Sequence, residues 1–490
     1  MNWVATVSAL LTVGSSYAGR GKAHGQNGTE RGYHYHFPRG GSEMKDHRLL
    51  LLVCVCSMTA FAQTKTNLVP NPEFRVDPTG QPISWQFWSP RPDLRPRADV
   101  TNDADGAVLR LTTIDFSSFG KWLSNSIPVA AGHFYRFQVL YKAQGISSER
   151  GRVEVMLTWN TADGQPVQRD YVDRISAAVH GWRNAARTLR APEKATSVTA
   201  ELWLRWTAGG SVMFRSPSLI ETSEPPPHNV RVVTTRIPVR WGTTVHDNLQ
   251  SMAEVLDRAG RDKPDVVLLT EIFPDCGVKG TVYDLSEPIP GPTTDVAARK
   301  AREYHTYIIT GMLERDGGKA YDTAVLIDRQ GRIAGKYRKV HLPLAEVEGG
   351  ETPGSEYPVF DTDFGRIGIL ICWDLFFPET VRILRLEGAN IVFVPIAGDP
   401  GARHYDVTTR ARALDNGVYL VTSVGDGRAS RIVNPDGEVM AETTDGLATA
   451  EIDLSKEWRE WWLSVGPAYG EAKSLVIEER RPDTYDLLIK

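Results

Sequence analysis

The chain has 490 residues, of which 41% are hydrophobic, which is enough for two or three domains with full cores. Its formal net charge is only -4 and the signs are mixed, which excludes a protein built to bind polyanions, so we expect no nucleic-acid partner. Four cysteines are too few for a disulfide scaffold.

Residues 44–62 have the three parts of a secretory signal peptide. Lys45 and Arg48 form a positive start, residues 49–58 form an apolar core, and a small-x-small motif ends at Ala62. The core is too short to span a bilayer as a stable helix, and an uncleaved anchor is the alternative. We therefore expect an exported protein, periplasmic or extracellular, after cleavage near Ala62.

Residues 1–43 are rich in Gly, His, Tyr and Arg and show no sustained periodicity. A signal peptide normally begins at the initiator methionine. We therefore expect translation to start at Met44 and residues 1–43 to be a non-native extension. The competing interpretation is that residues 1–18 are a signal of their own, but they lack a charged start.

Residues 67–222 contain short alternating strands separated by turn residues such as Ala162-Asp163-Gly164. This pattern predicts an antiparallel β-sandwich. The clearest predicted strands cover residues 108–113, 135–141, 153–159 and 198–206.

The opening of this segment, Asn-Leu-Val-Pro-Asn-Pro-Glu-Phe at 67–74, resembles the start of carbohydrate-binding-module-like jelly rolls. Gly181-Trp182 and a closing strand at 212–214 add to the resemblance. It implies a polysaccharide partner, and a structural or docking module is the equal alternative. Six tryptophans can stack on sugar rings, although we expect most of them to fill the core: Trp85, Trp88, Trp159, Trp182, Trp203 and Trp206.

Residues 223–228 contain three consecutive prolines and read as a stiff linker. From residue 229 the pattern changes to strands that alternate with helices, which predicts a layered α/β domain. The expected helices cover residues 245–259, 294–304, 380–387 and 408–416, and buried strands are expected at 230–237, 266–269, 367–371 and 391–395.

Three residues with reactive side chains stand at or near predicted strand ends: Glu271, Lys339 and Cys372. Ligand sites in α/β sheets gather at the carboxyl ends of strands. A thiol needs a base at neutral pH, which Glu271 provides, while Lys339 can hold the thiolate and a developing oxyanion. Together they form an acyl-transfer set that needs no metal and no cofactor. The alternative for Cys372 alone is a buried core cysteine.

Three motifs around these residues resemble the nitrilase superfamily of carbon–nitrogen hydrolases. They are Leu-Leu-Thr-Glu-Ile-Phe at 268–273, Tyr-Arg-Lys-Val-His-Leu at 337–342 and Ile-Cys-Trp-Asp-Leu-Phe-Phe-Pro-Glu at 371–379. The resemblance implies a nitrilase-like αββα four-layer sandwich over residues 229–455. It also implies Glu271 as general base, Lys339 as oxyanion stabiliser and Cys372 as nucleophile.

The family usually has a second glutamate seven or eight residues after the lysine motif. Glu346 fits this position best, Glu348 competes with it, and Glu351 fits less well. Asp415 departs from the family pattern, because a glutamate is common there. The family resemblance also implies a homodimer or higher homo-oligomer, and we expect the Trp-rich tail, residues 456–490, to contribute to its interface.

The expected function is an exported thiol hydrolase of a small-molecule amide or N-carbamoyl amide. Ammonia or an amine leaves while Lys339 and the backbone N–H of Trp373 hold the oxyanion. One alternative is a true nitrilase. Another is an inactive carbohydrate-binding or scaffold protein, and a Cys–His protease that uses His341 is the weakest alternative.

Overall fold

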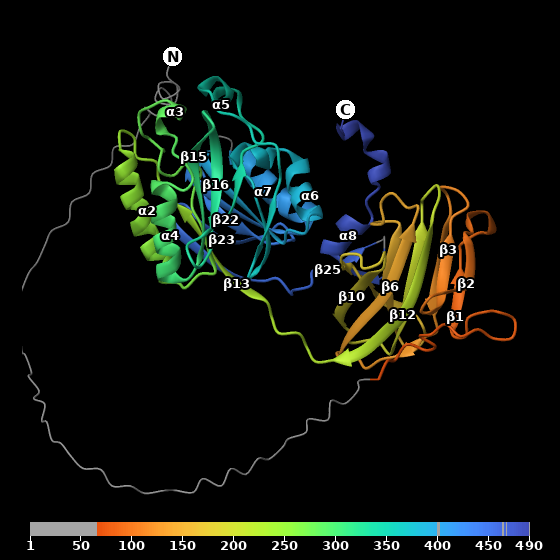
Figure 1. The fold of residues 1–490 in the computed structure, drawn as a ribbon. Helices are drawn as coiled ribbons and strands as arrows, with labels where there is room; N and C mark the ends of the chain where they lie inside the picture. The colour runs from red at the N-terminus through yellow and green to blue at the C-terminus, as the bar shows by residue number, and fades with distance from the viewer. Residues whose placement is uncertain (1–65, 399–401, 463–464, 467, 490) are drawn as a thin grey trace, which may run out of the picture. The chain divides into compact units, whose positions relative to one another are not determined.

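A computed structural model describes residues 66–398, 402–462, 465–466 and 468–489 (Figure 1). The expected signal peptide at 44–62 and the extension at 1–43 lie outside these residues. Within the described ranges, none of the helices has both the length and the apolar character needed to cross a membrane.

Residues 66–222 form two β-sheets that share one hydrophobic core. One sheet runs β1-β4-β11-β7-β8, with β5 beside β11, and the other runs β2-β3-β12-β6-β10-β9. Side chains alternate between core and solvent along the strands, as period-2 geometry requires: Tyr135, Phe137 and Val139 of β6 are buried while their neighbours are more exposed. The strands are β1 (Trp85–Trp88), β2 (Arg97–Asp103), β3 (Gly106–Thr112), β4 (Phe119–Ser124), β5 (Ile127–Pro128), β6 (Phe134–Gln144), β7 (Val153–Asn160), β8 (Pro166–Tyr171), β9 (Arg174–Ile175), β10 (Arg183–Arg190), β11 (Ser197–Arg205) and β12 (Ser211–Thr222), with a 3₁₀ turn at Pro92–Leu94.

The expectation that most of the six tryptophans fill this core is wrong. Trp85 and Trp159 are buried, but Trp88 is 41% exposed, and Trp182, Trp203 and Trp206 are half-buried. The reason is register: Trp203 lies on the face of β11 opposite the core residues Leu202 and Leu204.

Two further six-stranded sheets face each other within residues 229–453. Buried hydroxyls connect them, because Thr234 donates to the carbonyl of Thr422 at 2.6 Å and Thr235 lies 3.0 Å from Ser423. The first sheet runs β17-β16-β15-β14-β13-β24 and the second β18-β19-β20-β21-β22-β23. Their strands are β13 (Asn229–Arg236), β14 (Val266–Leu268), β15 (Tyr307–Asp316), β16 (Lys319–Ile327), β17 (Ile333–Arg338), β18 (Val359–Thr362), β19 (Gly365–Ile369), β20 (Ile391–Gly398), β21 (Tyr419–Asp426), β22 (Ser430–Val433), β23 (Val439–Thr443) and β24 (Gly446–Asp453).

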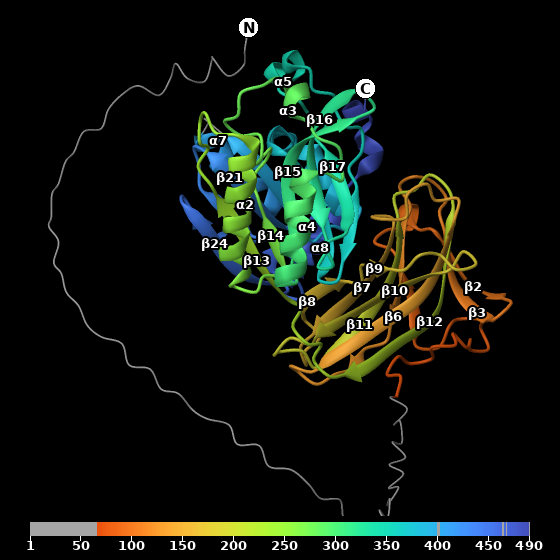
Figure 2. The same ribbon diagram turned by 60° about the vertical axis from the view of Figure 1, so that its left-hand side comes forward.

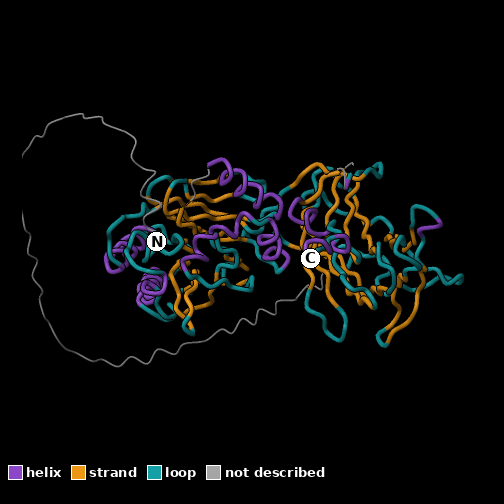
Figure 3. The backbone as a smooth tube through the Cα atoms, turned by 90° about the horizontal axis from the view of Figure 1, so that it is seen from above, coloured by secondary structure: helices purple, strands orange, loops and turns teal. Residues whose placement is uncertain are grey.

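Helices cover the outer faces of these two sheets, so the layers run helix, sheet, sheet, helix (Figures 2 and 3). Met252 and Leu256 of α2 and Ala297 of α4 pack on the first sheet, and Val381 and Leu384 of α6 belong to the core of the second. The helices are α2 (Val245–Gly260), α3 (Val282–Leu285), α4 (Pro292–Tyr304), α5 (Leu344–Gly349), α6 (Pro378–Leu386) and α7 (Ala402–Asn416).

Each of the two sheets contains three adjacent parallel strands. β13, β14 and β15 run parallel in the first sheet, and β19, β20 and β21 run parallel in the second. Their carboxyl ends therefore collect the loops that follow β14 and β19.

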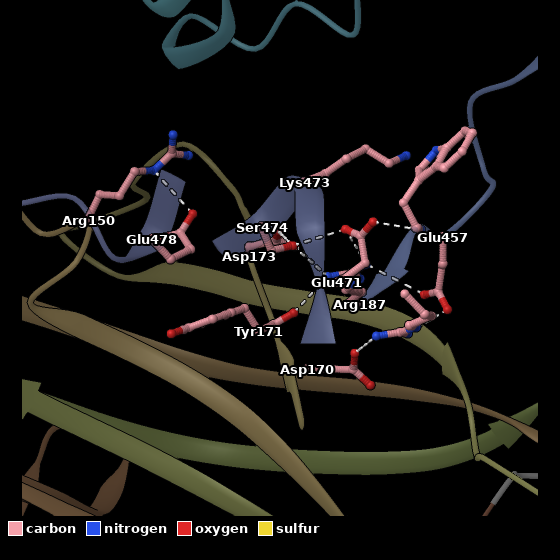
Figure 4. Close-up of polar contacts among 12 residues, drawn as sticks. Arg150, Asp170, Tyr171, Asp173, Arg187, Glu457, Glu471, Lys473, Ser474 and Glu478 are labelled. Carbon is pink, nitrogen blue, oxygen red and sulfur yellow. Dashed lines mark hydrogen bonds and ion pairs between the residues drawn. The ribbon is translucent and has the colours of Figure 1, made fainter. Parts of the chain in front are cut away.

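The tail folds back onto residues 66–222 of its own chain (Figure 4). β26 pairs with β8 at Tyr469 and Gln168, and Arg187 forms ion pairs with Glu471 at 3.4 Å and Glu457 at 3.5 Å. The expected role of residues 456–490 in a homodimer stays a prediction. The tail elements are β25 (Arg459–Trp462), β26 (Ala468–Glu471), α8 (Ala472–Glu478) and 3₁₀ turns at Pro482–Thr484 and Asp486–Ile489.

Candidate active site

Glu271 lies in the turn that follows β14 and is 2% exposed. Lys339 donates to one carboxylate oxygen at 2.7 Å, and the backbone N–H of Ala397 donates to the other. The next residue, Ile272, has φ of 40°. This left-handed conformation is strained for a β-branched side chain and marks a turn that the surrounding structure holds in place.

Lys339 follows β17 and is only 1% exposed. Its ammonium Nζ lies 2.7 Å from Glu271, 2.8 Å from Glu346 and 3.2 Å from Asp322. Its backbone N–H also donates to the carbonyl of Asp322 at 2.9 Å. The ammonium donates hydrogen bonds to Glu271 and Glu346 and forms an ion pair with Asp322, so three carboxyl groups fix it in position.

Cys372 begins the 3₁₀ turn Cys372–Phe376, and two residues separate it from the end of β19 at Ile369. Its φ of 45° is left-handed, so the nucleophile candidate sits on a strained bend. The thiol lies within hydrogen-bonding reach of Glu271, and the Lys339 ammonium is close enough to favour the thiolate. The side chain of Trp373 is 40% exposed and packs against Phe376 with ring centroids 5.0 Å apart.

Asp374 holds this bend from inside the protein and is fully buried. Its carboxylate accepts hydrogen bonds from the backbone N–H groups of Ile371 at 3.1 Å and His341 at 2.9 Å, and from the Tyr337 hydroxyl at 2.6 Å. The His341 ring contacts the same carboxylate at 2.9 Å and stacks on Phe377. His341 is therefore held by Asp374 and has a structural role in this turn.

Of the three candidate second glutamates, Glu346 on α5 reaches the lysine. Glu348 lies on the same short helix but is exposed. Glu351 follows the left-handed Gly350, and its carboxyl lies near that of Glu346. One oxygen each of Glu346 and Glu351 is buried and has no hydrogen-bond partner within the described residues. Both oxygens therefore have hydrogen-bonding capacity that the described residues leave unused.

The pKa values of Glu271 and Cys372 shift in opposite directions. Burial would raise the pKa of Glu271, but the Lys339 charge and hydrogen bonds from Asp322, Lys339 and Ala397 lower it below its ordinary value. Burial raises the pKa of the Cys372 thiol well above its usual range, Glu271 and Glu346 add to this, and Lys339 opposes it. The resting pair is therefore an ionised carboxylate beside a neutral thiol, as general-base activation requires.

Burial also raises the pKa of Glu346 to about 7 and that of Glu351 to about 8. For Lys339, burial works in the opposite direction, but Glu271, Asp322, Cys372 and Glu346 together raise its pKa well above the ordinary value. The ionised form of Lys339 is thus the favoured one. Glu271, Asp322 and Glu346 also have the spacing of a metal site, with ligand atoms within 4.8 Å of one another, and all three of them contact the Lys339 ammonium.

Sequence reasoning missed Asp322 and Asp374. Asp322 lies within β16, where the sequence has the pattern of an ordinary strand. Asp374 lies in the Cys372 motif, and the sequence gives it no role of its own. The Cys276 thiol is 3.7 Å from the carbonyl of Glu271, and Asp415, which departs from the family pattern, lies on α7 and pairs with Arg412 at 3.7 Å.

The chain is similar in sequence to known carbon-nitrogen hydrolases and amidases. The family profile of carbon-nitrogen hydrolases matches residues 229–461. An omega-amidase NIT2-A of Xenopus laevis is 34% identical over 232 residues, covering 42% of this chain and 83% of that protein. A nitrilase of Pyrococcus abyssi is 35% identical over 226 residues, covering 42% and 84%. A solved carbon-nitrogen hydrolase of Helicobacter pylori is 23% identical, with a TM-score of 0.45 over 54% of this chain and 99% of that chain.

The chain therefore belongs to the carbon–nitrogen hydrolase family, also called the nitrilase superfamily. Within this family it is an amidase-type hydrolase of carbon–nitrogen bonds. The family identity and the enzyme class that the three motifs predicted are confirmed.

Proposed function

We propose that the chain hydrolyses a non-peptide amide or N-carbamoyl amide through a thioester on Cys372. The observation that carries this proposal is the contact of one buried ammonium, Lys339, with two carboxylates, Glu271 and Glu346, beside a thiol on a strained bend. This set contains a base, a nucleophile and a fixed positive charge, which are the parts that acyl transfer needs.

In the first half of the reaction, Glu271 takes the thiol proton and the sulfur of Cys372 attacks the substrate carbonyl. The oxyanion forms beside the Lys339 ammonium and the backbone N–H of Trp373. A preorganised donor of this kind is worth about a hundred- to a thousand-fold in rate. Glu271 then gives its proton to the leaving nitrogen, so ammonia or an amine departs and a thioester forms.

In the second half, Glu271 removes a proton from water, and the resulting hydroxide attacks the thioester carbonyl. The carbon–sulfur bond breaks, the thiolate takes back a proton from Glu271, and a carboxylic acid or carbamic acid leaves. The unpartnered oxygen of Glu346 can accept an N–H of the substrate amide, which would hold the carbonyl toward Cys372. A nitrile is the alternative substrate class, because the same thiol can attack a nitrile carbon.

We also propose where this chemistry takes place and what accompanies it. The signal peptide at 44–62 would export the chain, and residues 67–222 would act as a carbohydrate-binding-module-like, jelly-roll β-sandwich joined by the linker 223–228. The exposed ring of Trp88 and the neighbouring half-buried Phe119 support a role in sugar stacking. A homodimer is expected from the family and stays part of this proposal.

The test is ammonia release by the purified protein on small amides, ω-amides, N-carbamoyl amines, N-carbamoyl amino acids and nitriles. Release should vanish in Cys372→Ala and fall at least about a thousand-fold in Glu271→Gln, because both groups act in the transition state. Cys276→Ala is the matched control and should keep the activity. Release that persists in Cys372→Ala would contradict the thioester. No release from any class by the folded protein would favour an inactive binding protein.

A further inference from the structure

Asp322 is a buried carboxyl at the centre of the site, and the mechanism above does not use it. It lies on β16, is 2% exposed, and has Oδ2 at 3.2 Å from the Lys339 ammonium. Because the Lys339 N–H also donates to the Asp322 carbonyl, the two residues hold a fixed position relative to each other. Its other oxygen, Oδ1, is buried and receives no hydrogen bond from any N–H or O–H group of the described residues.

The charges around Lys339 do not balance if every carboxyl is ionised. Glu271, Asp322 and Glu346 together would carry three negative charges against one ammonium, in a place where water cannot compensate them. Burying a charge without a partner is costly, so such a group normally takes up a proton instead. At least one of the three carboxyls should therefore be neutral in the resting enzyme.

Hydrogen bonding indicates which carboxyl that is. Both carboxylate oxygens of Glu271 accept hydrogen bonds, one from Lys339 and one from the backbone N–H of Ala397. These hydrogen bonds favour the ionised form of Glu271. Carboxyl oxygens of Asp322 and Glu271 lie within 4.8 Å of each other, and the two groups interact by a side-chain hydrogen bond. A contact between two carboxyl groups is favourable only when one of them carries a proton, and the oxygen without a donor is on Asp322. Glu346 also has a free oxygen, but its side chain is 14% exposed, whereas the side chain of Asp322 is 3% exposed. Burial therefore disfavours the ionised form of Asp322 more than that of Glu346.

We propose that Asp322 is a positioning residue that carries a proton in the resting enzyme and donates it in a hydrogen bond to Glu271, which keeps Glu271 ionised and turned toward Cys372. This inference rests on the proposed function, whose base is Glu271. In it, the proton stays on Asp322 throughout, and only Glu271 exchanges protons with Cys372, the leaving nitrogen and water. Burial and the negative charge of Glu271 raise the pKa of Asp322 well above its usual range, in agreement with the geometry.

The groups that face Asp322 come from three neighbouring segments. Glu271 and Cys276 belong to the loop after β14, Lys339 follows β17, Glu346 lies on α5, and Glu351 follows α5. Lys339 alone favours the ionised form of Asp322, whereas Glu271 and Glu351 oppose it. The pH behaviour of the site should therefore depend on whether position 322 can donate a hydrogen bond.

The test compares Asp322→Asn with Asp322→Leu in the full chain and needs no substrate. Asparagine can donate an N–H to Glu271 and accept from Lys339, whereas leucine has a similar size and can do neither. The readout is the pH dependence of iodoacetamide alkylation at Cys372, quantified on the peptide that contains it. We expect Asp322→Asn to keep the wild-type profile. In Asp322→Leu, Glu271 should lose a hydrogen bond and stay protonated to higher pH. The acidic limb of the alkylation profile should therefore move to higher pH by about one unit, which lowers the rate at its foot about tenfold.

Asp275→Leu is the matched control, because Asp275 is a buried carboxyl on the same loop as Glu271 and accepts from the backbone N–H of Leu313 at 3.1 Å. The Asp275→Leu change should leave the pH dependence of Cys372 alkylation unchanged. If Asp322→Asn loses reactivity as far as Asp322→Leu does, position 322 needs a negative charge and the proposal is wrong. An unmoved profile in folded Asp322→Leu would overturn it as well.

An infrared difference spectrum between the wild type and Asp322→Asn keeps the proposal testable if the leucine variant does not fold. The carbonyl band of a protonated carboxyl should be present in the wild type and missing in the variant, and loss of an ionised carboxylate band would refute the proposal. Neither readout depends on turnover. A failure to release ammonia would therefore count against the proposed function while leaving the state of Asp322 to be read independently.

Discussion

At the level of single residues, the site depends on buried carboxyl groups that hold other groups in place. Asp374 is the clearest case, because it accepts from two backbone N–H groups, one tyrosine and one histidine while it is fully buried. It fixes the bend on which Cys372 has its left-handed φ. The precise position of the sulfur thus depends on a carboxylate two residues away from it.

Asp374→Ala should lower both stability and activity. The change leaves buried donors of Ile371, His341 and Tyr337 without an acceptor, which should cost about 3 kcal/mol in the free energy of unfolding. Activity of the folded fraction should fall about a hundred-fold, because a shift of about 1 Å in a nucleophile has that effect. Denaturant unfolding and ammonia release measure the two quantities.

Asp363→Ala serves as the control, since Asp363 is an exposed partner of Arg329 with a side chain that is 54% exposed. Its removal should cost less than about 1 kcal/mol. If the Asp374 variant unfolded at the same denaturant concentration as wild type, the carboxylate would not be holding the bend.

That Glu271, Lys339 and Cys372 belong to one candidate site could be predicted, because each stands in a motif of its own. Asp322 could not, because an acidic residue in a strand normally points to solvent, and only the fold places it 3.2 Å from Lys339. The strained φ angle of Ile272 was equally out of reach, since local sequence does not show which bends tertiary contacts will enforce.

At the level of elements, periodicity predicted the long amphipathic helices well. The helix expected at 245–259 spans Val245–Gly260, where Thr244 and Asp247 form a capping box. The short helix α5 was missed, since six residues show no helical period, although it carries Glu346. β10 was also missed, because Arg183–Arg190 is largely polar and becomes a strand only through pairing with β6.

The last helix contains a group that makes stability depend on pH. Glu478 of α8 is 9% exposed, and burial raises its pKa from 4.5 to about 8, although Arg150 at 3.6 Å opposes this. The folded state therefore binds a proton that the unfolded state has lost between pH 4.5 and about 8. This contribution to stability is fully present below pH 4.5 and is lost as the pH rises through about 8.

Glu478→Gln should remove this dependence, because glutamine has nearly the same shape and does not titrate. We expect the melting temperature of the variant, relative to wild type, to rise steadily between about pH 5 and about pH 8.5. Thermal unfolding in a series of buffers measures it. Glu193→Gln is the control, with a side chain that is 71% exposed, and should track wild type at every pH. A constant difference between Glu478→Gln and wild type would show that Glu478 is ionised in the folded protein over the whole range.

At the level of the whole chain, the tail joins parts that are far apart in sequence. Trp458 packs against Tyr419, with ring centroids 6.3 Å apart, in the core of the hydrolase layers. Farther along, Leu475 of α8 packs with Met156 and Tyr171 on the outer face of the sheet that contains β7. Sequence analysis found the aromatic cluster of the tail but had no means of telling a contact within the chain from one between two copies.

A stop after residue 455 should therefore destabilise the protein as well as alter any oligomer. Truncation removes Trp458 from a core site where it is 6% exposed, and leaves the buried Arg187 without Glu457 and Glu471. Removing partners from a buried charge costs about 3–5 kcal/mol, which corresponds to a fall of several degrees in melting temperature for a chain of this size. Thermal unfolding and sedimentation of the full-length and truncated proteins at equal concentration give both quantities.

Trp461→Ala distinguishes the two possible uses of the tail, because Trp461 is 55% exposed and packs on Tyr469 at the surface. If the tail serves only its own chain, this variant should match wild type in mass and melting temperature, while the truncated form melts lower at an unchanged oligomeric state. If the tail also joins two copies, Trp461→Ala should lower the dimer fraction with its melting temperature nearly intact. A truncated form that melts like wild type would show that the contacts of Trp458, Arg187 and Leu475 contribute little to holding the fold together.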